Sequence, residues 1–155
     1  MGSRSTDLAY IAGFLDGDGS LMLQLKKRTD GRSGWRFMVT ICFYQDSRHD
    51  KPLIWIRRLF GVGYLSKRND GMSELRINGF RQVHDILVRL RPFIRFKRVQ
   101  VSALIAATGM LMKKKLSQTN LRKLIDYILV IQNQNYIAKR KKSRNELLKI
   151  VGLTP

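Results

Sequence analysis

The sequence predicts an α+β fold in which a four-stranded antiparallel sheet has helices on one face. Three observations support this class. The apolar spacing changes from helical to alternating after Gly19, two hairpin patterns are separated by one helical pattern, and amphipathic helical patterns follow the second hairpin. We expect the 155 residues to form one domain, with a core at about residues 6–112 and a helical extension at about 113–155.

The first element is predicted as a helix that Thr6 or Asp7 caps and that runs to about Asp16. Ala9, Gly13 and Gly17 recur every four residues, so they form a stripe of small residues along one side. Such a stripe lets another backbone approach closely. The pattern leaves open whether the neighbour is the protein's own core or another helix.

The strands follow in two hairpins. Residues 20–28 and 35 to about 45 alternate around a turn at 29–34, and residues 61–68 and 72–77 alternate around a turn at 69–71. Between them, residues 50–52 begin a helix that runs to residue 60, with proline in its first turn. Further helices are predicted at residues 80–90 and from about 98 to 112. The remainder is predicted as two helices or one broken helix.

Charge indicates the kind of partner. Thirty Lys and Arg against eleven Asp and Glu give a net charge of +19, which points to an anionic ligand. The polar side of the predicted sheet carries charges of nearly one sign and suits a nucleic-acid groove. No apolar run reaches the ~20 residues of a membrane span, and no secretory signal is visible. With Cys42 as the only cysteine, an intrachain disulfide and a cysteine-based zinc site are excluded.

The stretch "LAYIAGFLDGDGS", residues 8–20, closely resembles the motif of the LAGLIDADG homing endonucleases. The strand pair after it, the segment "GVGYLSKR" and the segment "LRPFIRFKRVQ" extend the resemblance over residues 8 to about 112. The family's αββαββα core agrees with the order of elements that the periodicity predicts. Only one copy of the motif is present, which is typical of the homodimeric members.

The resemblance implies a division of roles. Asp18 would be the metal-binding carboxylate, and the Gly17 carbonyl would supply a second contact to Mg²⁺, or to Mn²⁺ or Ca²⁺ in its place. Gln45 would hold the attacking water. Lys97 would act near the scissile phosphate, although the arginines on either side leave that assignment open. The motif helices of two copies would pack together through Ala9, Ala12, Gly13 and Asp16.

The outer face of the sheet and the loop after its second strand are predicted to contact DNA. On the first hairpin these residues are Ser20, Met22, Gln24, Lys26, Arg28, Arg36, Met38, Thr40, Cys42 and Tyr44. After it come Arg48, His49, Tyr64, Ser66, Arg68, Glu74 and Arg76. Arg140, in the basic run 139–142, is expected to touch phosphates.

The sequence therefore predicts a homing endonuclease, intracellular in a prokaryote or an organelle. As a homodimer it would bind a long pseudo-palindromic duplex and hydrolyse one phosphodiester bond in each strand. The resemblance also implies cleavage across the minor groove with short 3′ overhangs. Two alternatives stay open on the same fold. One is an RNA maturase that binds its host intron without using Asp18, and the other is a non-catalytic DNA-binding module.

Overall fold

The computed structural model describes residues 4–31, 33–135 and 141–155. The first half of the chain forms α1 (Ser5–Asp18), β1 (Gly19–Lys27), β2 (Trp35–Asp46), a 3₁₀ turn (Ser47–His49) and α2 (Lys51–Phe60). The second half forms β3 (Tyr64–Lys67), β4 (Met72–Asn78), α3 (Phe80–Leu90), a 3₁₀ turn (Arg91–Phe93), α4 (Arg98–Leu111), α5 (Gln118–Gln134) and α6 (Arg144–Ile150). The predicted α+β class and the order of elements are confirmed.

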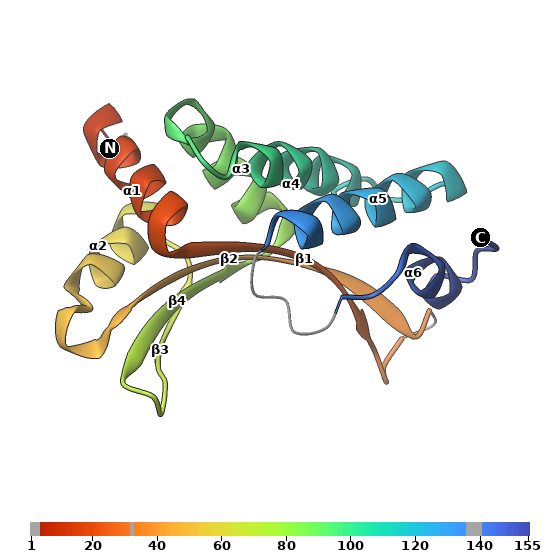
Figure 1. Cartoon of the computed structure of the whole chain (residues 1–155), viewed down its shortest axis with the longest axis horizontal. Helices are drawn as coiled ribbons and strands as arrows, with labels where there is room; N and C mark the ends of the chain where they lie inside the picture. Colours follow the sequence, from red (N-terminus) through yellow and green to blue (C-terminus); the bar gives the residue numbers. More distant parts are fainter. Residues whose placement is uncertain (1–3, 32, 136–140) are drawn as a thin grey trace.

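The four strands form one antiparallel sheet in the order β1-β2-β4-β3. In this register Ile41 lies opposite Leu21 on one side and Ile77 on the other, so the apolar positions of three strands align across the sheet. Figure 1 shows the sheet arching, with α1, α3, α4 and α5 on its convex side. The hairpin tips bend away from these helices, which leaves the concave face clear of them.

The core lies between the sheet and the helices. Leu21, Leu23, Val39, Ile41 and Phe43 are buried from the strands. They pack with helical residues that are spaced by three or four positions, among them Ile11, Leu15, Val83, Leu87, Leu104, Ala107, Leu124 and Ile128. Each buried Leu or Ile contributes about 1.5–3 kcal/mol relative to exposure, and together they fix the register that aims the alternate side chains outward.

One local expectation changes. The predicted cap of the first helix at Thr6 or Asp7 is wrong, because α1 begins at Ser5 after Arg4, whose extended backbone carbonyl accepts hydrogen bonds from the first turn. Of the two alternatives predicted for the C-terminal part, the structure has two helices, and α6 begins with a capping box between Ser143 and Glu146. No helix in the described ranges has the length and hydropathy to cross a membrane.

Candidate active site and DNA interface

Helix α1 delivers Asp18 directly onto the sheet. It ends at Asp18, and Gly19 begins β1 with no loop between the two elements. The Gly19 amide donates to the Leu15 carbonyl. A Cβ atom at Gly19 would lie 2.5 Å from Leu15 Cδ1 and 2.9 Å from the Leu15 backbone, so only glycine fits this junction. Asp18 is consequently exposed, at a fixed position on the edge of the sheet.

Asp16 has a different place from the one predicted. Its side chain is 7% exposed, and its carboxylate accepts three backbone N–H groups from the segment before α4. Oδ2 accepts from Arg95 at 2.6 Å and Phe96 at 3.2 Å, and Oδ1 accepts from Lys97 at 3.0 Å. The prediction that Asp16 lies at a dimer interface is therefore wrong, because its carboxylate is used inside the chain.

Lys97 lies against the C-terminal end of α1. Its Nζ donates to the Asp16 backbone carbonyl at 2.7 Å, where the helix dipole favours a cation. Within the described part of the chain, the ammonium forms no ion pair with a carboxylate. Its positive charge therefore stays available to an anion at the exposed end of the motif.

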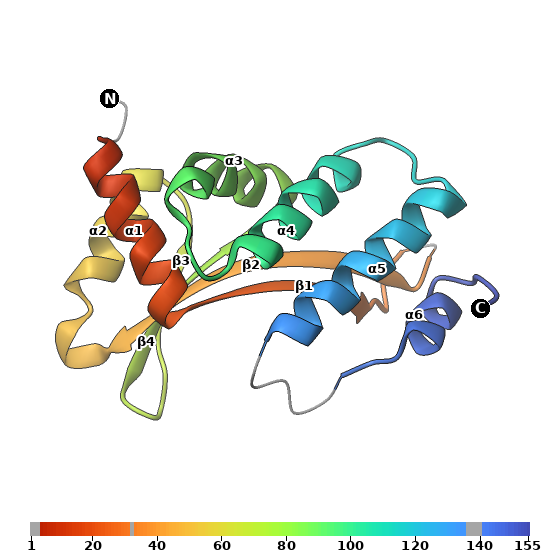
Figure 2. The same cartoon turned by 45° about the horizontal axis from the view of Figure 1, so that its top comes forward.

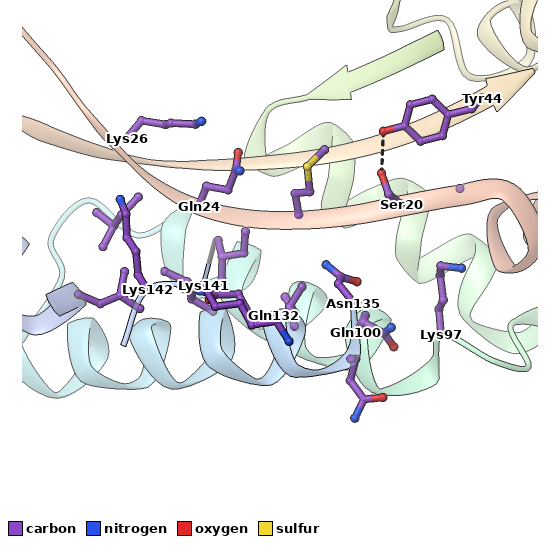
Figure 3. Close-up of a pocket in the computed structure, with 18 of the residues that line it drawn as sticks. Ser20, Gln24, Lys26, Tyr44, Lys97, Gln100, Gln132, Asn135, Lys141 and Lys142 are labelled. Atoms are coloured by element: carbon purple, nitrogen blue, oxygen red, sulfur yellow. Dashed lines mark hydrogen bonds between the residues drawn. The ribbon is translucent and has the colours of Figure 1, made fainter. Parts of the chain in front are cut away.

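Asp18 and Lys97 border the same groove, which has a volume of about 1680 Å³ and runs along the free edge of β1. One wall consists of outward side chains of β1, including Gln24 and Lys26. The opposite wall comes from α4, α5 and the segment before α6, with Lys97, Gln100, Gln132, Asn135, Lys141 and Lys142 labelled in Figure 3. Among the described residues, six Lys and Arg line it against three acids, so it suits a polyanion: Lys26, Lys27, Arg68, Lys97, Lys141 and Lys142 against Asp16, Asp18 and Glu146.

The amides of this groove were not predicted. Asn135 Nδ2 donates to the Leu21 carbonyl at the edge of the sheet, at 3.3 Å. The side-chain carbonyls of Gln100 and Gln132 are buried without a partner among the described residues. A glutamine inside a helical pattern carries no signal in the sequence, since only the packing of α4 and α5 beside β1 brings these residues to the groove that Asp18 borders.

Gln45 stands outside this groove. The described residues that line the groove include its neighbour Tyr44 but not Gln45. The Gln45 Oε1 atom accepts the backbone N–H of Asp46 at 2.9 Å. Asp18 and Lys97 thus line one groove, whereas Gln45 lies at the end of β2, two residues beyond the pairing of Phe43 with Gly19. The role of Gln45 stays a prediction.

The predicted DNA-binding residues follow the outer face of the strands. Lys26, Arg36, Tyr64 and Arg68 are exposed, and Ser20, Met22, Gln24, Met38, Tyr44, Ser66, Glu74 and Arg76 are half-buried. The Ser20 and Tyr44 hydroxyls are hydrogen-bonded at 3.0 Å (Figure 3). His49 is exposed in the turn after β2. Arg140 lies outside the described residues.

Several of these arginines are oriented by nearby acids. The ion pairs are Arg28–Asp30 at 3.1 Å, Arg48–Asp46 at 2.8 Å, Arg68–Asp70 at 2.8 Å and Arg76–Glu74 at 3.3 Å. The Arg48 guanidinium holds the pKa of the Asp46 carboxyl well below its usual range. The first three pairs are more exposed than the half-buried Arg76–Glu74 pair and contribute little to stability, so an incoming phosphate or base can replace their acids at small cost.

Two outer-face residues do not reach the surface. Thr40 and Cys42 have no exposed area, so the predictions that they contact DNA are wrong. Thr40 Oγ1 donates to Asn78 Oδ1 at 2.8 Å. Burial raises the pKa of the Cys42 thiol. Both lie on β2, which has β1 on one side and β4 on the other.

The exposed side of α1 carries the small residues. Ala9, Gly13 and Gly17 face solvent, and a Cβ atom at Gly13 or Gly17 would meet nothing within 4 Å in the chain. Packing on the chain's own core is thus excluded for this stripe. Ala12 is fully buried, so its predicted place at an interface is also wrong. Phe96 is 82% exposed directly after Arg95, and no sequence pattern predicted an exposed aromatic side chain at this place.

The described segments contain no all-protein metal site, because no three of their His, Cys, Asp or Glu residues come together to hold a metal ion. Hydrated Mg²⁺ needs fewer protein ligands, because it usually binds one or two carboxylates and completes its shell with waters and substrate phosphates. The exposed Asp18 carboxylate and the Gly17 carbonyl, at the negative end of α1, fit that pattern.

The sequence is similar to those of known endonucleases. A family model described as LAGLIDADG endonuclease matches residues 11–91, more than half of the chain. DNA endonuclease I-CvuI of Chlorella vulgaris is 32% identical over 97 residues, 63% of this chain and 60% of I-CvuI. DNA endonuclease I-CreI of Chlamydomonas reinhardtii is 26% identical over 144 residues, 93% of this chain and 87% of I-CreI.

Solved structures extend the likeness over nearly the whole chain. The crystal structure of I-CvuI in complex with its target in the presence of Ca has a TM-score of 0.85 at 25% identity, covering 97% of this chain and 98% of that one. The archaeal intron-encoded homing endonuclease I-Vdi141I, complexed with DNA, shares the fold with a TM-score of 0.81 at 19% identity, over 96% of each chain. This chain belongs to the LAGLIDADG endonuclease family.

Proposed function

We propose that this protein is a site-specific endonuclease that cuts both strands of double-stranded DNA as a homodimer. The observation that carries the proposal is the exposed Asp18 carboxylate, which borders a basic groove together with the Lys97 ammonium. The groove continues into the outward side chains of the sheet. The activity named for I-CvuI and I-CreI supports the same conclusion.

The proposal requires two copies, because each chain contributes one exposed acid of the motif. The stripe Ala9–Gly13–Gly17 leads along the open side of α1 to Asp18. If two α1 helices pack along this stripe, twofold symmetry brings the two Asp18 carboxylates together and places one sheet on each half of the duplex. Phe96 adds an exposed apolar side chain near the end of the helix.

Asp18 and the Gly17 carbonyl would hold the divalent cation. When bound, the cation would stabilise negative charge on the scissile phosphate and help to generate the attacking hydroxide. The Lys97 ammonium would stabilise charge that develops on the phosphate, since no carboxylate in the described structure neutralises it. Gln45, whose amide lies at the end of β2, would hold the water.

The function can be tested by cleavage of a randomised duplex library cloned in a plasmid. We expect cut molecules in Mg²⁺ and none in EDTA. Sequencing of the cut ends should give one long pseudo-palindromic site with short 3′ overhangs. Stable DNA binding without cutting would indicate the non-catalytic module instead, and selective binding of intron RNA over duplex DNA would indicate the maturase.

We expect the sheet to read bases and the basic segment before α6 to contact phosphates. Gln24→Ala should relax the target at a few positions that repeat in both half-sites, since one direct base contact is worth about 1–3 kcal/mol of discrimination. Lys142→Ala should instead weaken binding to all sequences and lower the salt slope by about one. Cleavage profiles over all single-base variants of the site separate the two effects. If Lys142→Ala reshapes the profile and Gln24→Ala preserves it, this division is wrong.

A further inference from the structure

We propose that Asp16 is a positioning residue that sets Lys97 against the metal-binding end of α1. This inference rests on the proposed function. It gives the first acid of the motif a role separate from that of Asp18: Asp18 faces the substrate, and Asp16 fixes the group that acts beside it.

The contacts of the Asp16 carboxylate carry the argument. Both of its oxygens are used, and all three donors are consecutive backbone N–H groups, those of Arg95, Phe96 and Lys97. Bonds from a charged acceptor to several backbone donors are short and directional. The segment they hold lies between the turn Arg91–Phe93 and the first residue of α4. Asp16 thus ties the start of α4 to the last turn of α1.

The same residue receives the Lys97 side chain. Lys97 donates its backbone N–H to the Asp16 carboxylate and its Nζ to the Asp16 carbonyl, so both ends of the lysine are attached to one residue. The carboxylate's bonds go to backbone groups, and no described carboxylate forms an ion pair with the ammonium. Lys97 is therefore held in place without losing its charge, as stabilisation of a phosphate requires.

Asp16→Asn tests the proposal with little change in shape. An amide has a single acceptor oxygen, and its NH₂ group would face a backbone N–H, so the carboxylate's set of bonds cannot survive. We expect the single-turnover cleavage rate in Mg²⁺ to fall by about 10- to 100-fold, as for a displaced catalytic group. Affinity for the target in Ca²⁺ should stay within about threefold, because the strand face is untouched. Asp85→Asn, which removes an exposed acid from α3, is the matched control and should keep the wild-type rate.

A double-mutant cycle with Lys97→Ala separates positioning from general stabilisation. If Asp16 acts through Lys97, adding Asp16→Asn to Lys97→Ala should lower the rate by less than about twofold more. If the two effects multiply, the proposal is overturned. A wild-type protein that does not cut DNA in Mg²⁺ would refute the proposed function. Hydrogen exchange would still decide whether the Asp16 carboxylate holds the backbone of residues 95–97.

Hydrogen exchange tests the geometry without any measurement of activity. Phe96 is 82% exposed, so its amide would exchange rapidly if the segment were an ordinary surface loop. We expect slow exchange at the amides of residues 95–97 in the wild-type protein. In Asp16→Asn these amides should lose protection while the later amides of α4 keep it. Rapid exchange at residues 95–97 in the wild type would overturn the proposal even if the variant fails to fold.

Discussion

Asp18→Asn should lower the cleavage rate by ~10³-fold or more, because several kcal/mol of charge stabilisation are lost with the metal ligand. Affinity for the target duplex should be kept or slightly increased. A neutral amide is a poor ligand for Mg²⁺, but it also removes an exposed negative charge that repels phosphate. The rate is measured on the selected duplex with enzyme in excess, and the affinity is measured in Ca²⁺.

The structure makes this expectation specific to Asp18. Its side chain is exposed at the junction of α1 and β1, where replacement leaves the core intact. The thermal midpoint should therefore match that of the wild-type protein, whereas Asp16→Asn, which breaks buried hydrogen bonds, should lower it. If a folded Asp18→Asn protein loses both DNA binding and cleavage, the assignment of Asp18 as a metal ligand is contradicted.

Gly13→Leu should convert the dimer to a monomer and abolish double-strand cleavage. Overpacking at a close contact costs about 1–3 kcal/mol, and twofold symmetry introduces the extra bulk twice, so the dissociation constant should rise by about 10²-fold or more. The isolated chain should fold normally, because a Cβ atom at Gly13 meets nothing within 4 Å. Sedimentation of the protein alone and on DNA measures the assembly.

Thr119→Leu is the matched control for this substitution. Thr119 is exposed in the first turn of α5, and this N-terminal end of the helix lies on the opposite side of the fold from α1 (Figures 1 and 2). The added bulk there should change neither the assembly nor the cleavage rate. A wild-type protein that sediments as a monomer with and without DNA would refute the proposed dimer. If Gly13→Leu still forms a dimer that cuts DNA, the dimer interface does not lie at the stripe Ala9–Gly13–Gly17.

Local patterns determined most of the fold. Alternation along residues 20–28 and 35–45 specifies which side chains enter the core, and a slip of one residue would expose Leu21, Leu23 and Ile41 together. The helical spacings and the turn residues at 69–71 likewise depend on neighbours a few positions apart. For that reason, the sheet and the order of elements could be predicted from local patterns, whereas the role of Asp18 was predicted from the resemblance of the motif to the LAGLIDADG family. The sequence also showed the stripe Ala9–Gly13–Gly17, although its spacing left open whether the stripe packs on the core or on another helix.

What the sequence could not determine depends on contacts between distant segments. Asp16 is bonded to residues about eighty positions away, and no periodicity distinguishes this buried acid from the exposed one two residues later. Thr40 and Cys42 have the correct parity for the outer face, yet they are buried, because exposure depends on the lengths of neighbouring side chains on other strands. Gln100 reaches the groove through the packing of α4 beside β1. The sequence by itself determined the fold, and through its resemblance to the family it predicted Asp18 as the acid that binds the metal. Only the tertiary structure decided that Asp16 holds Lys97, since the partners of a buried acid are donors that the chain supplies from distant positions.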